Sequence, residues 1–78
     1  DLGLYDLYKI LERPAQVTFR YGNKKYTVTS QMEDDECVIC FDHQWYRNVD
    51  DLFAKASLGD NLLTGIYDEL YDFVLHDN

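Results

Sequence analysis

The segment VTFRYGNKKYTVTS, from Val17 to Ser30, decides the fold. Apolar and polar residues alternate in each half of it, and the polar link Gly22 to Lys25 separates the two halves. Side chains of a β-strand point alternately to two faces, so this period of two predicts two half-buried strands. A short glycine-containing link between two such runs predicts a β-hairpin.

A third strand is expected over residues 37–41, after the acidic segment Met32 to Glu36, which we interpret as a solvated turn. The register can be derived from the apolar pattern, because a slip by one residue would invert every side chain. The expected cross-strand pairs are Val17–Ser30, Phe19–Val28, Tyr21–Tyr26, Ser30–Cys37, Val28–Ile39 and Tyr26–Phe41. They give an antiparallel meander over residues 16–42 with one apolar and one mostly polar face.

An amphipathic helix is expected on the N-terminal side of this meander. Within residues 2–13, apolar side chains recur at the spacing i, i+3, i+4 and i+7, as Leu4, Leu7, Tyr8 and Leu11. Pro14 ends the helix, because a proline disfavours the helical conformation of the residue before it.

A second helix is expected to begin after Asn48. Asparagine is a preferred N-cap, and Asp50 and Asp51 would lie in the first turn, where the helix dipole favours negative charge. The expected end is Leu58-Gly59. The inward residues would be Val49, Leu52, Phe53 and Ala56.

A third helix is expected after Asp60 or Asn61, either of which would cap it. Its expected inward residues are Leu62, Leu63, Ile66, Tyr67 and Leu70. Residues 71–76 alternate between apolar and polar, so they either extend this helix or form a short edge strand, and we favour the strand. Residues 45–47 are a further candidate for a short strand, after a turn at residues 42–44.

Length and composition indicate one domain with one core. The chain has 78 residues, of which 46% are hydrophobic, and no apolar run approaches the roughly 18 residues that cross a bilayer. We therefore expect a single small α+β domain over residues 1–78. It should be a three- to four-stranded antiparallel β-meander, packed on one face by an N-terminal helix and two short C-terminal helices. Two cysteines are too few for a disulfide scaffold, so we expect a cytoplasmic protein with no membrane partner.

The run ECVICFDH, from Glu36 to His43, has the cysteine and histidine spacing of a zinc site or a redox dithiol. On a strand, however, Cys37 and Cys40 are an odd number of positions apart and point to opposite faces. Zinc needs four converging ligands, and a thioredoxin-like dithiol begins a helix. We therefore expect no metal and no cofactor, with Cys37 in the core and Cys40 on the outer face.

The sequence contains no motif of a known enzyme class. It has no G-x-S-x-G, no H-E-x-x-H, no phosphate loop and no calcium-loop spacing. Ser30 and Ser57 have no histidine or acid at an activating spacing. We therefore expect no enzymatic activity and no catalytic residue. Nucleic acid is not an expected partner either, because 7 lysines and arginines stand against 15 acidic residues.

The net charge of −8 leads to two hypotheses about function. The first is an acidic protein-interaction module that binds a basic protein surface, as a regulatory or mobile-element protein would. The alternative is a housekeeping or self-associating structural domain whose acidity serves solubility, although nothing in the sequence indicates a homodimer. The expected interaction surface consists of Asp50, Asp51, Asp68, Glu69, Asp72 and Trp45, the last of which is otherwise a residue of the core edge.

Two longer runs, KYTVTSQMEDDE (residues 25–36) and WYRNVDDLFAKASLGDNLLTGIYDEL (residues 45–70), resemble short acidic proteins of Gram-positive bacteria and their prophages. The resemblance extends from about Val17 to Phe73. These proteins have no assigned activity, so the resemblance transfers no catalytic residue. It implies a small intracellular bacterial domain from a mobile element.

Overall fold

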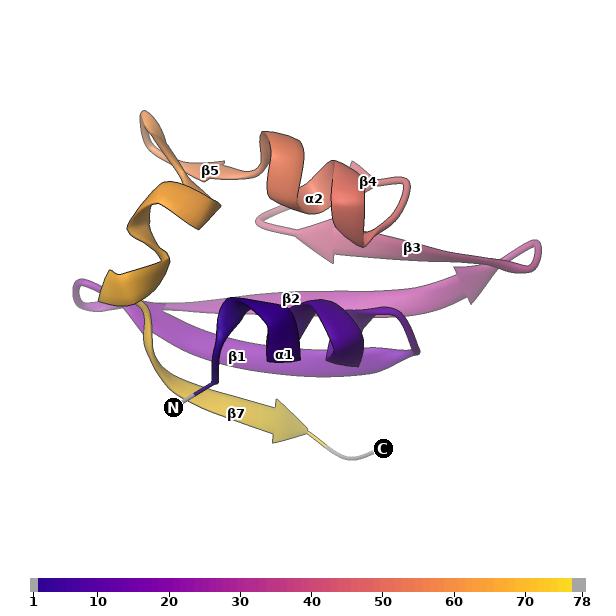
Figure 1. Cartoon of the computed structure of the whole chain (residues 1–78), viewed down its shortest axis with the longest axis horizontal. Helices are drawn as coiled ribbons and strands as arrows, with labels where there is room; N and C mark the ends of the chain where they lie inside the picture. The colour runs from indigo at the N-terminus through magenta and orange to yellow at the C-terminus, as the bar shows by residue number, and fades with distance from the viewer. Residues whose placement is uncertain (1, 77–78) are drawn as a thin grey trace.

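A five-stranded antiparallel sheet forms the centre of the molecule (Figure 1). The computed structural model describes residues 2–76. The elements in chain order are α1 (Leu4–Leu11), β1 (Ala15–Tyr21), β2 (Lys24–Glu33), β3 (Glu36–Phe41), β4 (Gln44–Tyr46), α2 (Val49–Lys55), β5 (Ser57–Leu58), β6 (Asn61–Leu62), the 3₁₀-helix η1 (Leu63–Glu69) and β7 (Tyr71–His76). The strand order is β4-β3-β2-β1-β7, and β5 pairs separately with β6. The predicted α+β class is confirmed.

The helices and the sheet share one core, which lies on one face of the sheet. Val17 pairs with Val28, and Val28 with Phe41, so these three side chains point to the same face. They meet the apolar stripe of α1, as its predicted amphipathic pattern requires. The buried apolar residues are Leu7, Leu11, Val17, Phe19, Val28, Ile39, Phe41, Val49, Leu52, Ala56, Leu58, Leu63, Ile66 and Leu70.

Both hairpin registers differ by two residues from the predicted ones. In β1 and β2, Phe19 pairs with Tyr26 instead of Val28, and in β2 and β3, Val28 pairs with Phe41 instead of Ile39. Side chains alternate with a period of two, so a shift of two residues leaves every side chain on its predicted face. The predicted apolar face is therefore right although the predicted pairs are wrong.

The register shift arises from turns that are shorter than predicted. The β1–β2 link is the two-residue turn Gly22-Asn23, in which Gly22 has a φ of 60°. The β2–β3 link is Asp34-Asp35, with φ values of 50° and 69°. Aspartate tolerates this left-handed region, and two-residue turns of this kind match the twist of the strands they join. The acidic segment Met32 to Glu36 is therefore mostly strand and not the solvated turn that we expected.

The N-terminus of α2 agrees with the prediction, but its end does not. Asn48 caps α2, since its side-chain oxygen accepts the Asp51 N–H at 2.8 Å. The helix ends at Lys55 instead of Leu58-Gly59, because residues 57–62 form the β5–β6 ribbon. Gly59, with a φ of 62°, lies in the turn of this ribbon and is not a helix cap.

The third predicted helix is a 3₁₀-helix, and no side chain caps it. Leu63, Ile66 and Leu70 are buried as expected, but Leu62 lies in β6 and is 50% exposed. Tyr67 is half-buried and donates its hydroxyl proton to the Leu2 carbonyl at 2.9 Å. Its burial raises the pKa of Tyr67 to about 12. This tyrosine therefore ties η1 to the start of the chain.

Residues 71–76 form an edge strand, as favoured from the sequence, and β4 adds the further short strand. The pairing of β7 with β1 shifts between Thr18 and Arg20, and Asp72 has a φ of 56°. This is a β-bulge at the start of β7. No helix within residues 2–76 has the length and apolarity that crossing a membrane requires.

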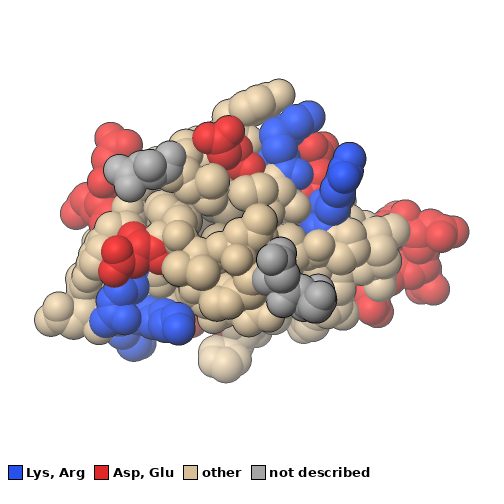
Figure 2. Space-filling model, turned by 90° about the horizontal axis from the view of Figure 1, so that it is seen from below, with Lys and Arg blue, Asp and Glu red and all other residues tan. Residues whose placement is uncertain are grey.

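Two clusters of charged side chains lie at the two ends of the sheet. The acidic residues Glu33 to Glu36 are exposed at the β2–β3 turn, at the right-hand end of Figure 1. Lys24 and Lys25 are exposed next to the β1–β2 turn, at the left-hand end. Figure 2 looks onto the edge formed by β7 and shows red and blue side chains mainly around its periphery. Among the described residues, few charged side chains therefore lie in the centre of this face.

Candidate functional site

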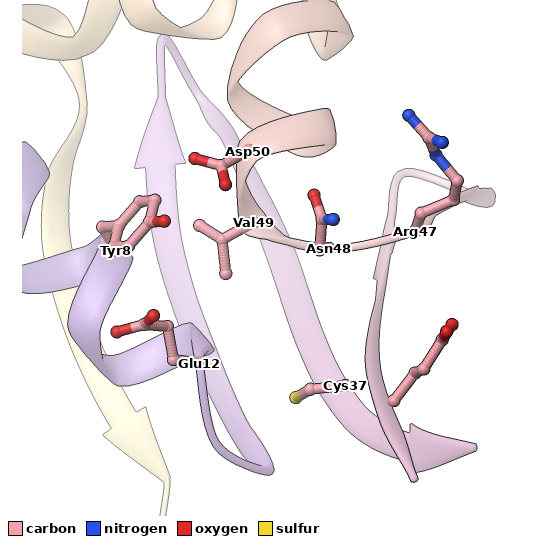
Figure 3. A pocket seen from close by; sticks show the side chains of 8 residues that line it. Tyr8, Glu12, Cys37, Arg47, Asn48, Val49 and Asp50 are labelled. Carbon is pink, nitrogen blue, oxygen red and sulfur yellow. The ribbon is translucent and has the colours of Figure 1, made fainter. Parts of the chain in front are cut away.

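A groove with several carboxylates lies between the C-terminal half of α1, the N-terminus of α2 and the start of β3 (Figure 3). Its volume is about 450 Å³. The lining residues are Tyr8, Glu12, Glu36, Cys37, Arg47, Asn48, Val49 and Asp50. We refer to this feature as the acidic groove. It is a surface depression formed by three elements that are distant in the sequence.

Local structure explains how the lining side chains reach the acidic groove. Tyr8 and Glu12 are four residues apart on α1, so they lie on the same side of that helix, next to the buried Leu11. The Asn48 cap fixes the start of α2, which places the buried Val49 at the groove floor. Asp50 follows directly and is exposed. The groove lining therefore combines the apolar Val49 side chain and the Tyr8 ring with carboxylates and Arg47.

The acidic groove is lined by three carboxylates, Glu12, Glu36 and Asp50, and by one cation, the exposed Arg47, so its charge balance is negative. Figure 3 shows Tyr8 of α1 and Asp50 of α2 facing one another across it. The Asp50 carboxylate beside the hydroxyl raises the pKa of Tyr8, and desolvation and Glu12 raise it further. Lys9 approaches Glu12 at 3.6 Å, but both side chains are about half-exposed, so this pair neutralises the groove only weakly. A cationic ligand would therefore be favoured there.

Asp51 is not part of an exposed acidic surface, which corrects our expectation. It is only 9% exposed. Its carboxylate accepts the Lys55 ammonium at 2.9 Å and the Arg47 backbone N–H at 3.0 Å, and the Arg47 guanidinium lies at 3.6 Å. Lys55 and the Arg47 N–H lower the pKa of Asp51. The helical pattern predicted an exposed Asp51. Such a pattern does not show that the carboxylate turns back over the start of α2, where Lys55 and Arg47 cover it.

Replacing Asp51 by asparagine should reduce stability in a pH-dependent manner. A carboxyl group with a lowered pKa in the folded state stabilises the fold above its unfolded pKa of about 4, and this contribution is lost as the pH falls through the folded value. We expect Asp51→Asn to be less stable than the wild type at pH 7, with a smaller difference at pH 3. Urea unfolding at both values measures this. Exposed Asp60→Asn is the control, and a difference that is independent of pH would contradict the ion-pair role.

The other predicted surface residues lie in separate places. Asp68 lines a hollow beside Leu2, whereas Asp72 lines one on the opposite side of the sheet beside Arg20. Glu69 is exposed on η1. Of the five predicted acids, only Asp50 lies in the acidic groove.

Trp45 is exposed on β4, opposite Cys40 on the outer face of the sheet. It is therefore not part of the core edge. Its position leaves it available to a partner, but it lies outside the acidic groove.

Glu12 and Glu36 are groove residues that the sequence reasoning did not include. The position of Glu12 could have been predicted, because it follows Tyr8 by one turn of a helix that the sequence indicates. Glu36 gave no such signal, because we assigned the acidic segment to a solvated turn. The start of β3 and the end of α1 approach each other only in the folded state, which no local pattern shows.

The two cysteines lie on opposite faces of β3, as predicted, but Cys37 is only partly buried and lines the acidic groove instead of lying in the core. The Cys37 Sγ lies 3.6 Å from the Leu11 carbonyl, on the side of α1, whereas Cys40 pairs with Trp45 and lines a hollow on the outer face. His43 borders that same outer hollow, and His76 bonds Thr18. Among the residues that the structure describes, no three His, Cys, Asp or Glu side chains are placed to hold a metal ion.

We predict that protein purified without reductant forms no Cys37–Cys40 disulfide and binds no stoichiometric zinc. The reason is that the strand separates the two thiols onto opposite faces, which a disulfide cannot bridge without backbone movement. Intact mass spectrometry and elemental analysis measure both properties. A monomer lighter by the mass of two hydrogens, or zinc that survives mild chelation, would contradict this arrangement.

Comparisons of the chain with protein-family models, with curated proteins and with solved structures gave no match. Function therefore has to be inferred from the acidic groove and from the distribution of charge.

Proposed function

We propose that the protein is a non-enzymatic interaction domain that binds a basic surface of another protein through the acidic groove. The observation that carries the proposal is that Glu12, Glu36 and Asp50, from three different elements, line one depression against a single cationic lining residue, Arg47. The net charge of −8 adds a long-range attraction for a cationic partner.

A lysine or arginine side chain of the partner fits the chemistry of this groove. Its aliphatic stem would pack on Val49 and the Tyr8 ring, and its charged end would meet the carboxylates at the rim. Charge-assisted hydrogen bonds to carboxylates are about twice as strong as neutral ones. The exposed acids Glu33 to Asp35 adjoin Glu36 and would increase the association rate by steering.

We place this activity in the bacterial cytoplasm, as part of a regulatory or mobile-element protein. The resemblance to short acidic prophage proteins supports this setting. The excess of acids over bases argues against nucleic acid as the partner, because each phosphate contact needs a lysine or arginine. The proposal needs no cofactor, no metal and no catalytic residue.

Charge reversal in the acidic groove should abolish binding to the basic partner. The groove variant is Glu12→Lys, Glu36→Lys and Asp50→Lys, and the matched control is Asp60→Lys, Asp68→Lys and Glu69→Lys. Each variant exchanges three negative charges for three positive ones, so both carry a net charge of −2 instead of −8. The probe is a synthetic peptide rich in lysine and arginine, with a host-cell lysate as a second arm.

We expect the wild type and the control variant to bind the peptide and to retain a common lysate protein, and the groove variant to bind neither. Binding should weaken as salt rises, because the Debye length falls from about 10 Å at 0.1 M to about 3 Å at 1 M. Circular dichroism checks that both variants fold. Equal loss in both variants would show that only net charge matters, and tight binding of DNA or RNA by the wild type would refute the proposal.

A further inference from the structure

The edge strand β7 presents an unprotected strand edge. β7 pairs with β1 on one side, and within residues 2–76 no strand pairs with its other side. Its sequence, YDFVLH, contains no proline or lysine, which are the residues that commonly blunt sheet edges. The bulge at Asp72 disturbs the start of the strand, and residues 74–76 pair regularly with β1. Such an edge is a template for pairing with another strand.

Exposed apolar side chains lie along this edge. Val74 and Leu75 are each about half-exposed. Val74 borders a hollow on the outer face, and Leu75 borders another beside Ile10 and Pro14 of the helical side. Figure 2, which looks onto this edge, shows that among the described residues a broad region without Lys, Arg, Asp or Glu lies beside a group of acidic and basic side chains. The exposed Val74 and Leu75 lie between charged side chains, because Arg20, Lys25 and Asp72 border the hollow beside Val74, and Lys9, Glu12 and Arg13 border the hollow beside Leu75.

The strand is complementary to itself when two copies run antiparallel. If Val74 of each copy lies on the two-fold axis, Phe73 pairs with Leu75 of the second copy, and Asp72 pairs with His76 of the second copy. The Asp72 carboxylate of each copy thus lies opposite the His76 imidazole of the other copy, once at each end of the interface. Asp72, Val74 and His76 border the same hollow, so all three belong to the outer face.

The His76 ring is anchored on the neighbouring strand β1. Its Nε2 lies 2.9 Å from the Thr18 hydroxyl, which fixes the ring against β1. When Nε2 accepts this hydrogen bond, the other ring nitrogen carries a proton and can donate it to a carboxylate. Thr18 itself is buried, so the anchor is rigid.

The opposite edge of the sheet, formed by β4, is less suited to pairing with a second copy. β4 has only three residues, and turns flank it on both sides. Self-pairing there would bury little surface and could form few backbone hydrogen bonds.

The geometry points to a homodimer in which β7 of two copies pairs antiparallel and joins the two sheets into one continuous sheet of ten strands. The occupant of the β7 edge is a second copy of this chain. This dimer does not depend on binding at the acidic groove, although Glu12 borders both that groove and the hollow beside Leu75.

Sedimentation equilibrium over a range of protein concentrations tests the dimer. We expect the wild type to dimerise reversibly, and Val74→Lys to raise the dimer dissociation constant at least about tenfold, because two ammonium groups would then face each other on the axis. Met32→Lys is the matched control, since Met32 is 50% exposed and Val74 49%, and both changes add one positive charge. A wild type that stays monomeric, or a Val74→Lys variant that dimerises like the control, would overturn the inference.

A charge swap tests the register. His76→Asp alone sets two carboxylates against each other at both ends and should weaken the dimer about tenfold. The double variant Asp72→His and His76→Asp restores opposite partners and should return the dissociation constant to within about threefold of the wild type. Histidine tolerates the positive φ of position 72. A double variant no better than His76→Asp would refute the pairing of Asp72 with His76.

The salt dependence of binding distinguishes the β7 dimer from the proposed binding of a basic partner. Two copies of net charge −8 repel each other, so the dimer should tighten as salt rises, whereas binding of a basic partner should weaken. A dimer that dissociates in high salt would count against β7 pairing. If Val74→Lys no longer binds the lysine- and arginine-rich peptide, then β7 binds the peptide and not a second copy of the chain. This result would overturn the inference and leave the proposal for the acidic groove untouched.

Discussion

Replacing Phe19 by alanine should cost about 3–5 kcal/mol of unfolding free energy, which is the usual loss for a buried phenylalanine. Phe19 is only 1% exposed. Its ring lies 5.9 Å from the rings of Tyr26 and Phe41 and 5.5 Å from that of Phe73, measured between centroids. It therefore joins β1 to β2, β3 and β7 through one aromatic cluster.

This loss is large for a small domain. A chain of this length has a typical stability of about 4–12 kcal/mol, so the substitution should remove between about a quarter and all of it. Urea unfolding followed by circular dichroism measures the change. Tyr5→Ala, at an exposed position of α1, is the control and should change stability by less than about 0.5 kcal/mol. Equal effects of the two substitutions would contradict the central position of Phe19.

Replacing Leu63 by alanine should cost about 2–5 kcal/mol, whereas the same change at the neighbouring Leu62 should cost less than about 1 kcal/mol. Leu63 is 1% exposed and packs in the core at the start of η1, and Leu62 is 50% exposed in β6. The two substitutions remove the same atoms from adjacent positions. The difference between the two losses of unfolding free energy therefore reports the different burial of the two side chains.

This pair of leucines also separates the observed fold from the predicted one. The predicted α-helix capped by Asp60 or Asn61 had both leucines facing inward, so both substitutions would then be costly. Thermal or urea unfolding of the two variants distinguishes these cases. Comparable losses at both positions would favour the predicted α-helix over the β6 strand and the 3₁₀-helix.

Strand positions and side-chain faces could be predicted from the sequence because they depend on a local period of two. The alternation through Val17, Phe19, Val28 and Ile39 correctly identified the buried face. The Asn48 cap was equally local and was also correct. The registers were wrong because they depend on turn length, and a polar run such as Gly22 to Lys25 does not show how many of its residues continue the strands.

The candidate site was less predictable because it depends on packing between distant segments. Asp51 belongs to a regular helical pattern, but ion pairs with Arg47 and Lys55 cover it. Glu12 and Glu36 are separated along the chain and meet only when α1 packs beside β3. A helical wheel shows which face of a helix is polar, but it does not show which neighbours that face will have.

The acidic groove can be tested most directly by nuclear magnetic resonance with the ¹⁵N-labelled domain and the lysine- and arginine-rich peptide. We predict that the largest amide shift changes occur at Tyr8, Glu12, Glu36 and Asp50, saturate with added peptide, and vanish in the groove variant. Shift changes confined to Asp68, Glu69 and Asp72, or spread evenly over all exposed acids, would contradict a binding site in the acidic groove.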